Sequence, residues 1–279
     1  MNTITFPNLN LEFNIDPVAF RIGEKPIYWY GIIIMSGIVI ALIMAYFRIK
    51  KMPEVDRLSK KISWDTVIDL VLWMLPIGII CARLYFCIFK WDYYSANPME
   101  IFKIWNGGLA IYGGIIGGVV TGIIFCKIKK INFFELADFF IPYLPFCQAV
   151  GRWGNFVNRE AFGEQTDTFF KMGLYSETGK MEYYHPAFLY ESVCNFIIFF
   201  ILLKLYKNKK FSGQIFCLYF ILYGIARFFI EGIRTDSLYI GNTDIRVSQA
   251  LSLVLVVVFG IIYIVKRILY SKGFLKKTK

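Results

Sequence analysis

Seven long apolar segments constrain the fold of this chain more than any other feature. They span approximately residues 28–47, 66–89, 109–126, 133–151, 187–206, 213–232 and 247–265. A helix needs about 20 mostly apolar residues to cross a bilayer, and each segment approaches that length. Because the chain is 57% hydrophobic, a single soluble core could not bury its apolar surface. We therefore expect an all-α integral membrane protein with about seven transmembrane helices, in one polytopic domain over residues 1–279.

The fourth apolar segment is the most interrupted of the seven. It contains Glu135, Asp138, Pro142 and Pro145. Prolines are tolerated in membrane helices when neighbouring groups satisfy the carbonyls that they free. We therefore predict one kinked span, which ends at the polar stretch GRWGNFVNREAFGE, residues 151–164.

Lysine and arginine are distributed unevenly between the two sides that seven crossings would define. One side carries 19 of the 31, in residues 48–61, 127–130, 204–210 and 266–279, and the other side carries 10. Because cytoplasmic loops are enriched in these residues, the C-terminus and the basic tail 266–279 are predicted to be cytoplasmic. The N-terminal segment 1–27 is then outside, and residues 152–186 form a small extracytoplasmic head between spans four and five. Topology thus explains the net charge of +11, and nucleic acid is not an expected partner.

The six cysteines lie scattered through the apolar segments, without a C-x-x-C motif or a Cys/His ligand spacing. Free cysteine packs as a small hydrophobic residue in protein interiors. We therefore expect neither a metal site nor a disulfide framework.

Polar residues follow the fourth apolar segment. In a helix that continues outward, Arg152, Asn155 and Arg159 lie at i, i+3 and i+7, on one face. Gly151 and Gly154 would let a neighbouring backbone or a ligand approach closely. Two interpretations are open: an arginine that reaches the lipid phosphates from the interface, or the wall of a binding site.

A second polar stripe lies in the sixth segment, in YGIARFFIEGIRTD. Tyr223, Arg227, Glu231 and Arg234 occur at i, i+4, i+8 and i+11, along one face of a helix. An ionisable residue within a span is a functional-site hypothesis by default. The alternative is an Arg227–Glu231 ion pair that serves only helix packing. Two arginines beside one glutamate leave one positive charge over, which favours an anionic ligand.

Arg83 and Glu191 are each open to two interpretations, and a set of glycines concerns helix packing. Arg83, in the outer half of span two, either contacts a ligand or extends to the interface. Glu191, near the start of span five, either orients an arginine or anchors helix packing. Gly114, Gly118 and Gly122 follow the small-xxx-small pattern of closely packed membrane helices.

These motifs together resemble the prolipoprotein diacylglyceryl transferase family. The resemblance rests on IYWYG, WNGGLAIYGG, GRWGNFVNREAFG, HPAFLYE and YGIARFFIEGIRTD, which occur in family order between residues 28 and 236. It implies a transferase of the bacterial cytoplasmic membrane that needs no cofactor. Such enzymes move the diacylglyceryl group of phosphatidylglycerol onto the lipobox cysteine thiol of a prolipoprotein, forming a thioether and releasing glycerol phosphate. The implied partners are phosphatidylglycerol and lipobox-containing signal peptides.

The resemblance also implies roles for individual residues. The residues expected to act in catalysis are Tyr30, Tyr112, Arg152, Arg227 and Glu231. Those expected to bind phosphatidylglycerol are Arg152, Asn155, Asn158, Gly163, Arg227 and Arg234, to which we add Arg83 for its position. Many family members have histidine where this chain has Tyr112, so the group that deprotonates the thiol is left open.

A transporter or channel with an intramembrane, arginine-lined anion site is the main alternative. It would also place arginines and glycine-rich helices in the membrane. Inverted repeats would favour a transporter, and the sequence shows none. A membrane hydrolase is disfavoured because the sequence lacks G-x-S-x-G and H-E-x-x-H motifs.

Overall fold

Long apolar helices dominate the fold. The computed structural model describes residues 2–54, 61–176, 178–241 and 243–275, so Arg57, Lys60 and the tail residues 276–279 lie outside the described residues. Within these ranges, six helices are long and apolar enough to cross a membrane. They are α1 (Trp29–Lys51), α3 (Trp64–Phe89), α5 (Ile111–Lys129), α8 (Ala187–Tyr206), α9 (Gln214–Ile233) and α10 (Val247–Ser271). The protein is therefore a multi-pass membrane protein whose spanning elements are helices.

The fourth apolar segment forms two helices instead of one kinked helix. α6 (Phe133–Phe140) and α7 (Tyr143–Asn158) are separated at residues 141–142, and Pro142 is the N-cap of α7. Proline has no backbone N–H to continue the hydrogen-bond ladder of a preceding helix. Neither helix reaches the length that a crossing needs. A seventh crossing, made by the two helices in series, therefore stays a prediction.

Two small antiparallel sheets accompany the helices, and the all-α prediction did not include them. β1 (Thr3–Phe6), β2 (Leu11–Asn14), β5 (Met172–Tyr175) and β6 (Met181–Tyr184) form a four-stranded sheet in the order β2-β1-β5-β6. β3 (Val18–Ile22) and β4 (Lys25–Tyr28) form a hairpin directly before α1. Strands of four or five residues leave too little alternation in the sequence to be detected.

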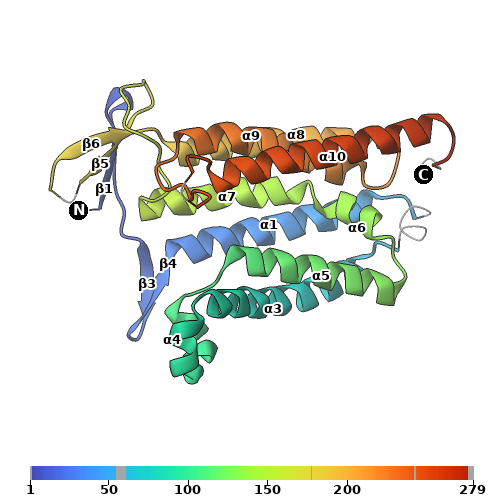
Figure 1. The fold of residues 1–279 in the computed structure, drawn as a ribbon, viewed down its shortest axis with the longest axis horizontal. Coiled ribbons are helices and arrows are strands. Elements are labelled where there is room, and N and C mark those ends of the chain that lie inside the picture. Colours follow the sequence, from blue (N-terminus) through green and yellow to red (C-terminus); the bar gives the residue numbers. More distant parts are fainter. Residues whose placement is uncertain (1, 55–60, 177, 242, 276–279) are drawn as a thin grey trace. The chain divides into compact units, whose positions relative to one another are not determined.

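The chain folds into two compact units. The first comprises Met1–Ala45 and Ala137–Lys279, and the second comprises Tyr46–Leu136. In the first unit, α7, α8, α9 and α10 run side by side, and the four-stranded sheet lies at one end of them (Figure 1). The second unit contains α3 and α5, with α4 (Trp91–Ala96) and short 3-10 turns between them.

The four-stranded sheet is anchored on the ends of α7 and α8. Its buried face packs in one hydrophobic cluster with both helices, comprising Ile4, Phe6, Phe156, Val157, Met172, Leu174 and Phe188. Because β1 pairs with β5, the N-terminal segment and residues 172–184 lie at the same end of this unit. The sequence-based topology requires these two segments to share a side.

At the other end of the first unit, a buried carboxylate organises the start of α9. Asp138 accepts hydrogen bonds from the backbone N–H groups of Gly213 and Phe216, both at 2.8 Å. Its Oδ2 lies 3.1 Å from Nζ of Lys209, which is also buried. A carboxylate at a helix N-terminus satisfies donors that have no partner within the helix. This arrangement explains how an ionisable residue is accommodated inside the fourth apolar segment.

In the second unit, glycines bring α3 and α5 close together. A Cβ atom on Gly113 would lie 2.4 Å from the carbonyl oxygen of Cys81, and a Cβ atom on Gly117 would lie 2.6 Å from the Cβ of Cys81. A Cβ atom on Gly118 would instead make an ordinary contact, 3.8 Å from Cγ of Met74. The small-xxx-small pattern therefore located the close packing correctly, but the tightest pair is one residue earlier than predicted.

The glycine packing yields a matched pair of substitutions. We expect Gly113→Ala to destabilise the protein by about 1–3 kcal/mol, because the added methyl group forces two helix backbones apart. Gly118→Ala places the same group on the same helix at an ordinary contact distance, so its effect is expected to stay within about 0.5 kcal/mol. Thermal unfolding of both variants in detergent measures the difference. Equal stabilities would contradict the packing described here.

Candidate active site

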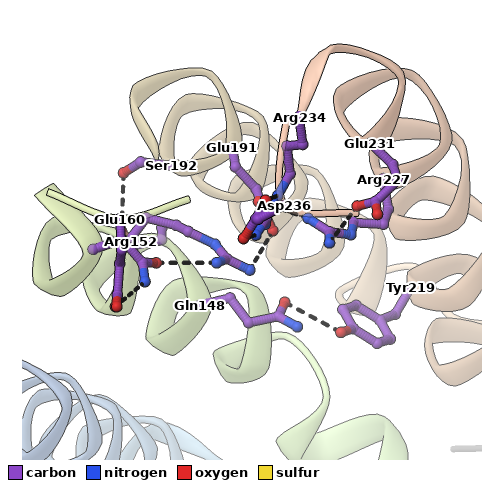
Figure 2. A network of polar contacts seen from close by, with 12 residues as sticks. Gln148, Arg152, Glu160, Glu191, Ser192, Tyr219, Arg227, Glu231, Arg234 and Asp236 are labelled. Atoms are coloured by element: carbon purple, nitrogen blue, oxygen red, sulfur yellow. Dashed lines mark hydrogen bonds and ion pairs between the residues drawn. The ribbon is translucent and has the colours of Figure 1, made fainter. Parts of the chain in front are cut away.

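A buried carboxylate gathers three arginines in the first unit. Oε1 of Glu191 in α8 lies 2.6 Å from Nη2 of Arg152 in α7. Its Oε2 accepts a hydrogen bond of 3.0 Å from Nη1 of Arg227 in α9. Nη1 of Arg234, which follows α9, lies 3.8 Å from the same oxygen. Figure 2 shows these side chains converging from the three helices, so the two polar motifs form one cluster.

Two further carboxylates hold the arginines of the second motif. Oε2 of Glu231 lies 2.6 Å from Nη2 of Arg227, which is the predicted i, i+4 ion pair. Asp236 receives two hydrogen bonds from Arg234, at 2.9 Å from Nε and 2.6 Å from Nη2. The hydrogen bonds from Arg234 hold the pKa of Asp236 below its ordinary value. Arg234 is therefore presented in a fixed, bidentate geometry.

The three arginines are balanced by three carboxylates, which corrects the predicted excess of positive charge. The sequence stripe counted only one glutamate, whereas Glu191 and Asp236 add two more anions. The central carboxylate is less accessible than the arginines beside it, whereas Asp236, which binds Arg234, is 47% exposed. The side chains of Arg152 and Arg227 are 22% and 15% exposed, while that of Glu191 is 4% exposed. Beside Glu191, an incoming anion would thus meet the arginine side chains first, and each guanidinium has five donors to share.

The amide of Asn155 links Arg152 to the end of α7. Asn155 is buried, and its Oδ1 accepts a hydrogen bond of 3.0 Å from Nη1 of Arg152. Its Nδ2 donates to Oε1 of Glu160 at 2.8 Å, and Nδ2 of Asn158 donates to the same oxygen at 3.4 Å. Asn155 thereby fixes the direction in which Arg152 extends.

Arg159 does not share a face with Arg152 and Asn155, so that expectation is wrong. α7 ends at Asn158, and Arg159 adopts a left-handed conformation with φ of 56°. Such a residue terminates a helix because it redirects the backbone. The Arg159 side chain instead donates to the carbonyl oxygen of Ile15, at 3.3 Å.

Two glycines of the first motif permit close contacts next to the cluster. A Cβ atom on Gly154 would lie 2.6 Å from Cδ2 of Tyr30, so the Tyr30 ring lies directly against α7. A Cβ atom on Gly163 would lie 2.7 Å from Cβ of His185 and 2.9 Å from the carbonyl oxygen of Ile233. Gly163 forms a β-bridge with Arg234, so it joins the segment after α7 to the end of α9.

Two predicted site residues, Arg83 and Tyr112, belong to the second unit. Arg83 is buried, and its three side-chain nitrogens donate to backbone carbonyls of the connection between α3 and α5; the acceptors are those of Glu100, Ile101, Lys103, Gly107 and Gly108. These contacts hold that connection in place. Tyr112 is the second residue of α5, and 44% of its surface is exposed.

Sequence reasoning did not select four residues that support the cluster. Oε1 of Gln148 accepts a hydrogen bond of 3.2 Å from the Tyr219 hydroxyl. Ser192 donates to the carbonyl oxygen of Ala149 at 2.9 Å, which holds α8 to α7. Asp236, the fourth, lies at the end of a quoted motif. Helical spacing offered one signal, since Gln148 precedes Arg152 by four residues.

The described part of the chain contains no group of three His, Cys, Asp or Glu residues placed to hold a metal ion. Its six cysteines are free thiols. The chemistry available at the cluster is therefore that of guanidinium, carboxylate, amide and phenol groups.

Comparison with known proteins identifies the family. The family model described as prolipoprotein diacylglyceryl transferase matches residues 17–265. Three curated relatives carry the name phosphatidylglycerol–prolipoprotein diacylglyceryl transferase. The protein of Listeria innocua is 45% identical over 272 residues, 95% of each chain. That of Finegoldia magna is 46% identical over 266 residues, 95% of this chain and all of the relative. That of Bacillus velezensis is 44% identical over 270 residues, 94% of this chain and 95% of the relative. With this similarity along nearly its whole length, the chain belongs to the prolipoprotein diacylglyceryl transferase family.

Proposed function

We propose that this protein transfers the diacylglyceryl group of phosphatidylglycerol to the lipobox cysteine thiol of a prolipoprotein. Membership of the family supports the reaction class. The observation that carries the proposal is the convergence of Arg152 and Arg227 on Glu191, with the arginine side chains partly exposed. A site of this kind fits a phosphate ester held at the edge of a membrane.

The reaction exchanges a carbon–oxygen bond for a carbon–sulfur bond. The thiolate of the prolipoprotein attacks the carbon of the diacylglyceryl unit that is bonded to the phosphate oxygen, and glycerol phosphate leaves with the electron pair of that carbon–oxygen bond. Guanidinium groups bind phosphate oxygens bidentately and stay charged at any relevant pH. Placed before the reaction begins, Arg152 and Arg227 stabilise the charge that builds up on the leaving group. The nucleophile comes from the substrate, so the enzyme needs none of its own.

The remaining site residues take supporting roles in this proposal. Asn155 and Asn158 position the end of α7 and offer hydrogen bonds to glycerol hydroxyls, and Arg234 adds a third cation to the lipid headgroup. Gly163 allows Arg234 to approach the segment after α7. Arg83 is proposed as a lipid contact only because of its predicted place in the outer half of span two. Its side-chain nitrogens donate to backbone carbonyls, so its hydrogen bonds give the proposal no support.

An arginine-lined transporter or channel is not favoured. The relatives along nearly the whole chain carry a transferase name. Incubating the purified protein with phosphatidylglycerol and a lipobox peptide tests the proposal directly. Mass spectrometry should detect a diacylglyceryl group on the peptide cysteine, together with free glycerol phosphate. An unmodified peptide under conditions where the protein stays folded would refute the proposed reaction.

The arginine pair yields the first prediction for this reaction. Arg152→Lys and Arg227→Lys keep the positive charge but lose the paired N–H donors that bind a phosphate bidentately. Turnover should therefore fall by about tenfold to over a hundredfold. Arg159→Lys is the matched control, since Arg159 follows the same helix but extends to the Ile15 carbonyl. Its turnover should stay close to that of the parent. Normal turnover in both the Arg152 and Arg227 variants would remove them from the mechanism.

Tyr112 yields the second prediction. A thiol with a pKa of about 8.5 is mostly protonated at neutral pH, so the reaction needs a group that takes its proton. A phenol, with an ordinary pKa of about 10, is a poor base unless an adjacent guanidinium group lowers that pKa. We propose that Tyr112 orients the lipid or the thiol by hydrogen bonding, and that Tyr30 or Glu231 accepts the proton. Tyr112→Phe should then keep measurable activity. Complete loss of activity in a folded Tyr112→Phe variant would instead identify the phenol as the base.

The proposed location is the bacterial cytoplasmic membrane, with the sheet end of the first unit outside. The excess of lysine and arginine on the C-terminal side supports this orientation. A cysteine introduced at Lys171, before β5, should react with an impermeant maleimide in intact cells. One introduced at Lys210, between α8 and α9, should react only after lysis. The reverse pattern would invert the orientation.

A further inference from the structure

A layer of neutral polar groups lies one helical turn below the arginine cluster. Gln148 precedes Arg152 by four residues in α7, and Asn195 follows Glu191 by four residues in α8. α7 runs toward the four-stranded sheet and α8 runs away from it (Figure 1). The Arg152–Glu191 ion pair places these two residues at the same height along the antiparallel helices. Both amides therefore lie about 6 Å farther from the sheet than the ion pair, which is the rise of four residues.

α9 contributes two phenols to the same region. Tyr223 precedes Arg227 by four residues, and its ring stacks on that of Tyr219 with centroids 5.5 Å apart. The Tyr219 hydroxyl donates to Oε1 of Gln148. That hydrogen bond fixes the orientation of the amide and leaves the Nε2 group of Gln148 as its donor. Gln148 is half-buried and not fully enclosed, so we expect a ligand to reach this donor.

Asn195 shows independently that this level favours a polar occupant. Only 1% of its surface is exposed. Neither its Nδ2 nor its Oδ1 has a hydrogen-bond partner among the residues that the structure describes. A buried amide without partners is costly in free energy. Deeper still, the interior is apolar and includes Ile198, Leu202 and Ile215.

From the sheet end of the first unit inward, the order of these environments matches the order of chemical groups in a phospholipid. Charged groups come first, then neutral hydrogen-bonding groups, then apolar side chains. A glycerophospholipid presents its phosphate, its ester carbonyls and its acyl chains in the same order. We propose that the neutral layer is a subsite for the ester groups of the diacylglyceryl moiety. In this subsite, Gln148 donates from Nε2 to an ester carbonyl oxygen. The proposal rests on the proposed function, since it assumes that the phosphate lies at Arg152 and Arg227.

The subsite predicts discrimination between ester-linked and ether-linked lipids. A dialkyl ether analogue of phosphatidylglycerol keeps the phosphate, the headgroup and the chains but lacks the carbonyl oxygens. The experiment compares kcat/KM for thioether formation from the two lipids, at matched chain length, in the parent and in Gln148→Met. The methionine side chain keeps the length of glutamine and removes the donor.

The parent should prefer the diester lipid by about three- to tenfold, the value of one neutral hydrogen bond. Gln148→Met should lose this preference, because its rate with the diester falls while its rate with the diether is retained. The retained diether rate shows that the variant is folded. Gln249→Met is the matched control: Gln249 is in α10 and its Nε2 donates to the carbonyl oxygen of Phe228. It should keep the preference of the parent.

Two results would overturn the subsite: equal rates of the parent with both lipids, or an unchanged preference in Gln148→Met. If Gln148→Met is inactive with both lipids, Tyr219→Phe decides, since loss of the hydroxyl that orients Gln148 should also reduce the preference. An unchanged preference in that variant would reject the proposal. Absence of any transfer from phosphatidylglycerol by the parent would reject the proposed function itself, and the subsite with it.

Discussion

The contact between the Glu191 carboxylate and three guanidinium groups is the interaction on which the candidate site depends. Arginines gathered from α7 and α9 would repel one another in a poorly screened environment. Glu191 contacts all three and is almost fully buried. Removing one partner from such a buried arrangement costs about 3–5 kcal/mol. The carboxylate therefore makes the cluster possible, and it also neutralises much of the charge that the site presents.

The part of the chain outside the helices fixes the geometry of this cluster. The sheet core contains Phe156 of α7 and Phe188 of α8, and each lies within one turn of a cluster residue, Arg152 or Glu191. Packing of the sheet therefore holds the two helix ends at a constant separation. The N-terminal strands, far from the site in sequence, contribute to its rigidity through β1.

In the proposed assignment, the arginine cluster and the groups beneath it together bind an amphiphilic substrate. Ionised groups lie at the sheet end of the first unit, amides and phenols lie one turn deeper, and aliphatic side chains follow. Each level offers the interaction that its part of a phospholipid requires. Glu191 and Glu231 are buried more deeply than the arginines that they bind, which favours an anion at that part of the cluster, although the formal charges balance and Asp236 is exposed.

Six of the seven predicted spans, the family and the two polar motifs that form the arginine cluster could be predicted from the sequence. These features are local: apolar length indicates a span, and spacings such as Arg227 to Glu231 place residues on one face of one helix. Packing between separate elements places Glu191 at the centre of the cluster, directs Arg159 to Ile15 and pairs β1 with β5. The structure also divides the fourth segment into two helices. Such features depend on how separate helices and strands pack, and no spacing within a single segment encodes the level at which two helices meet.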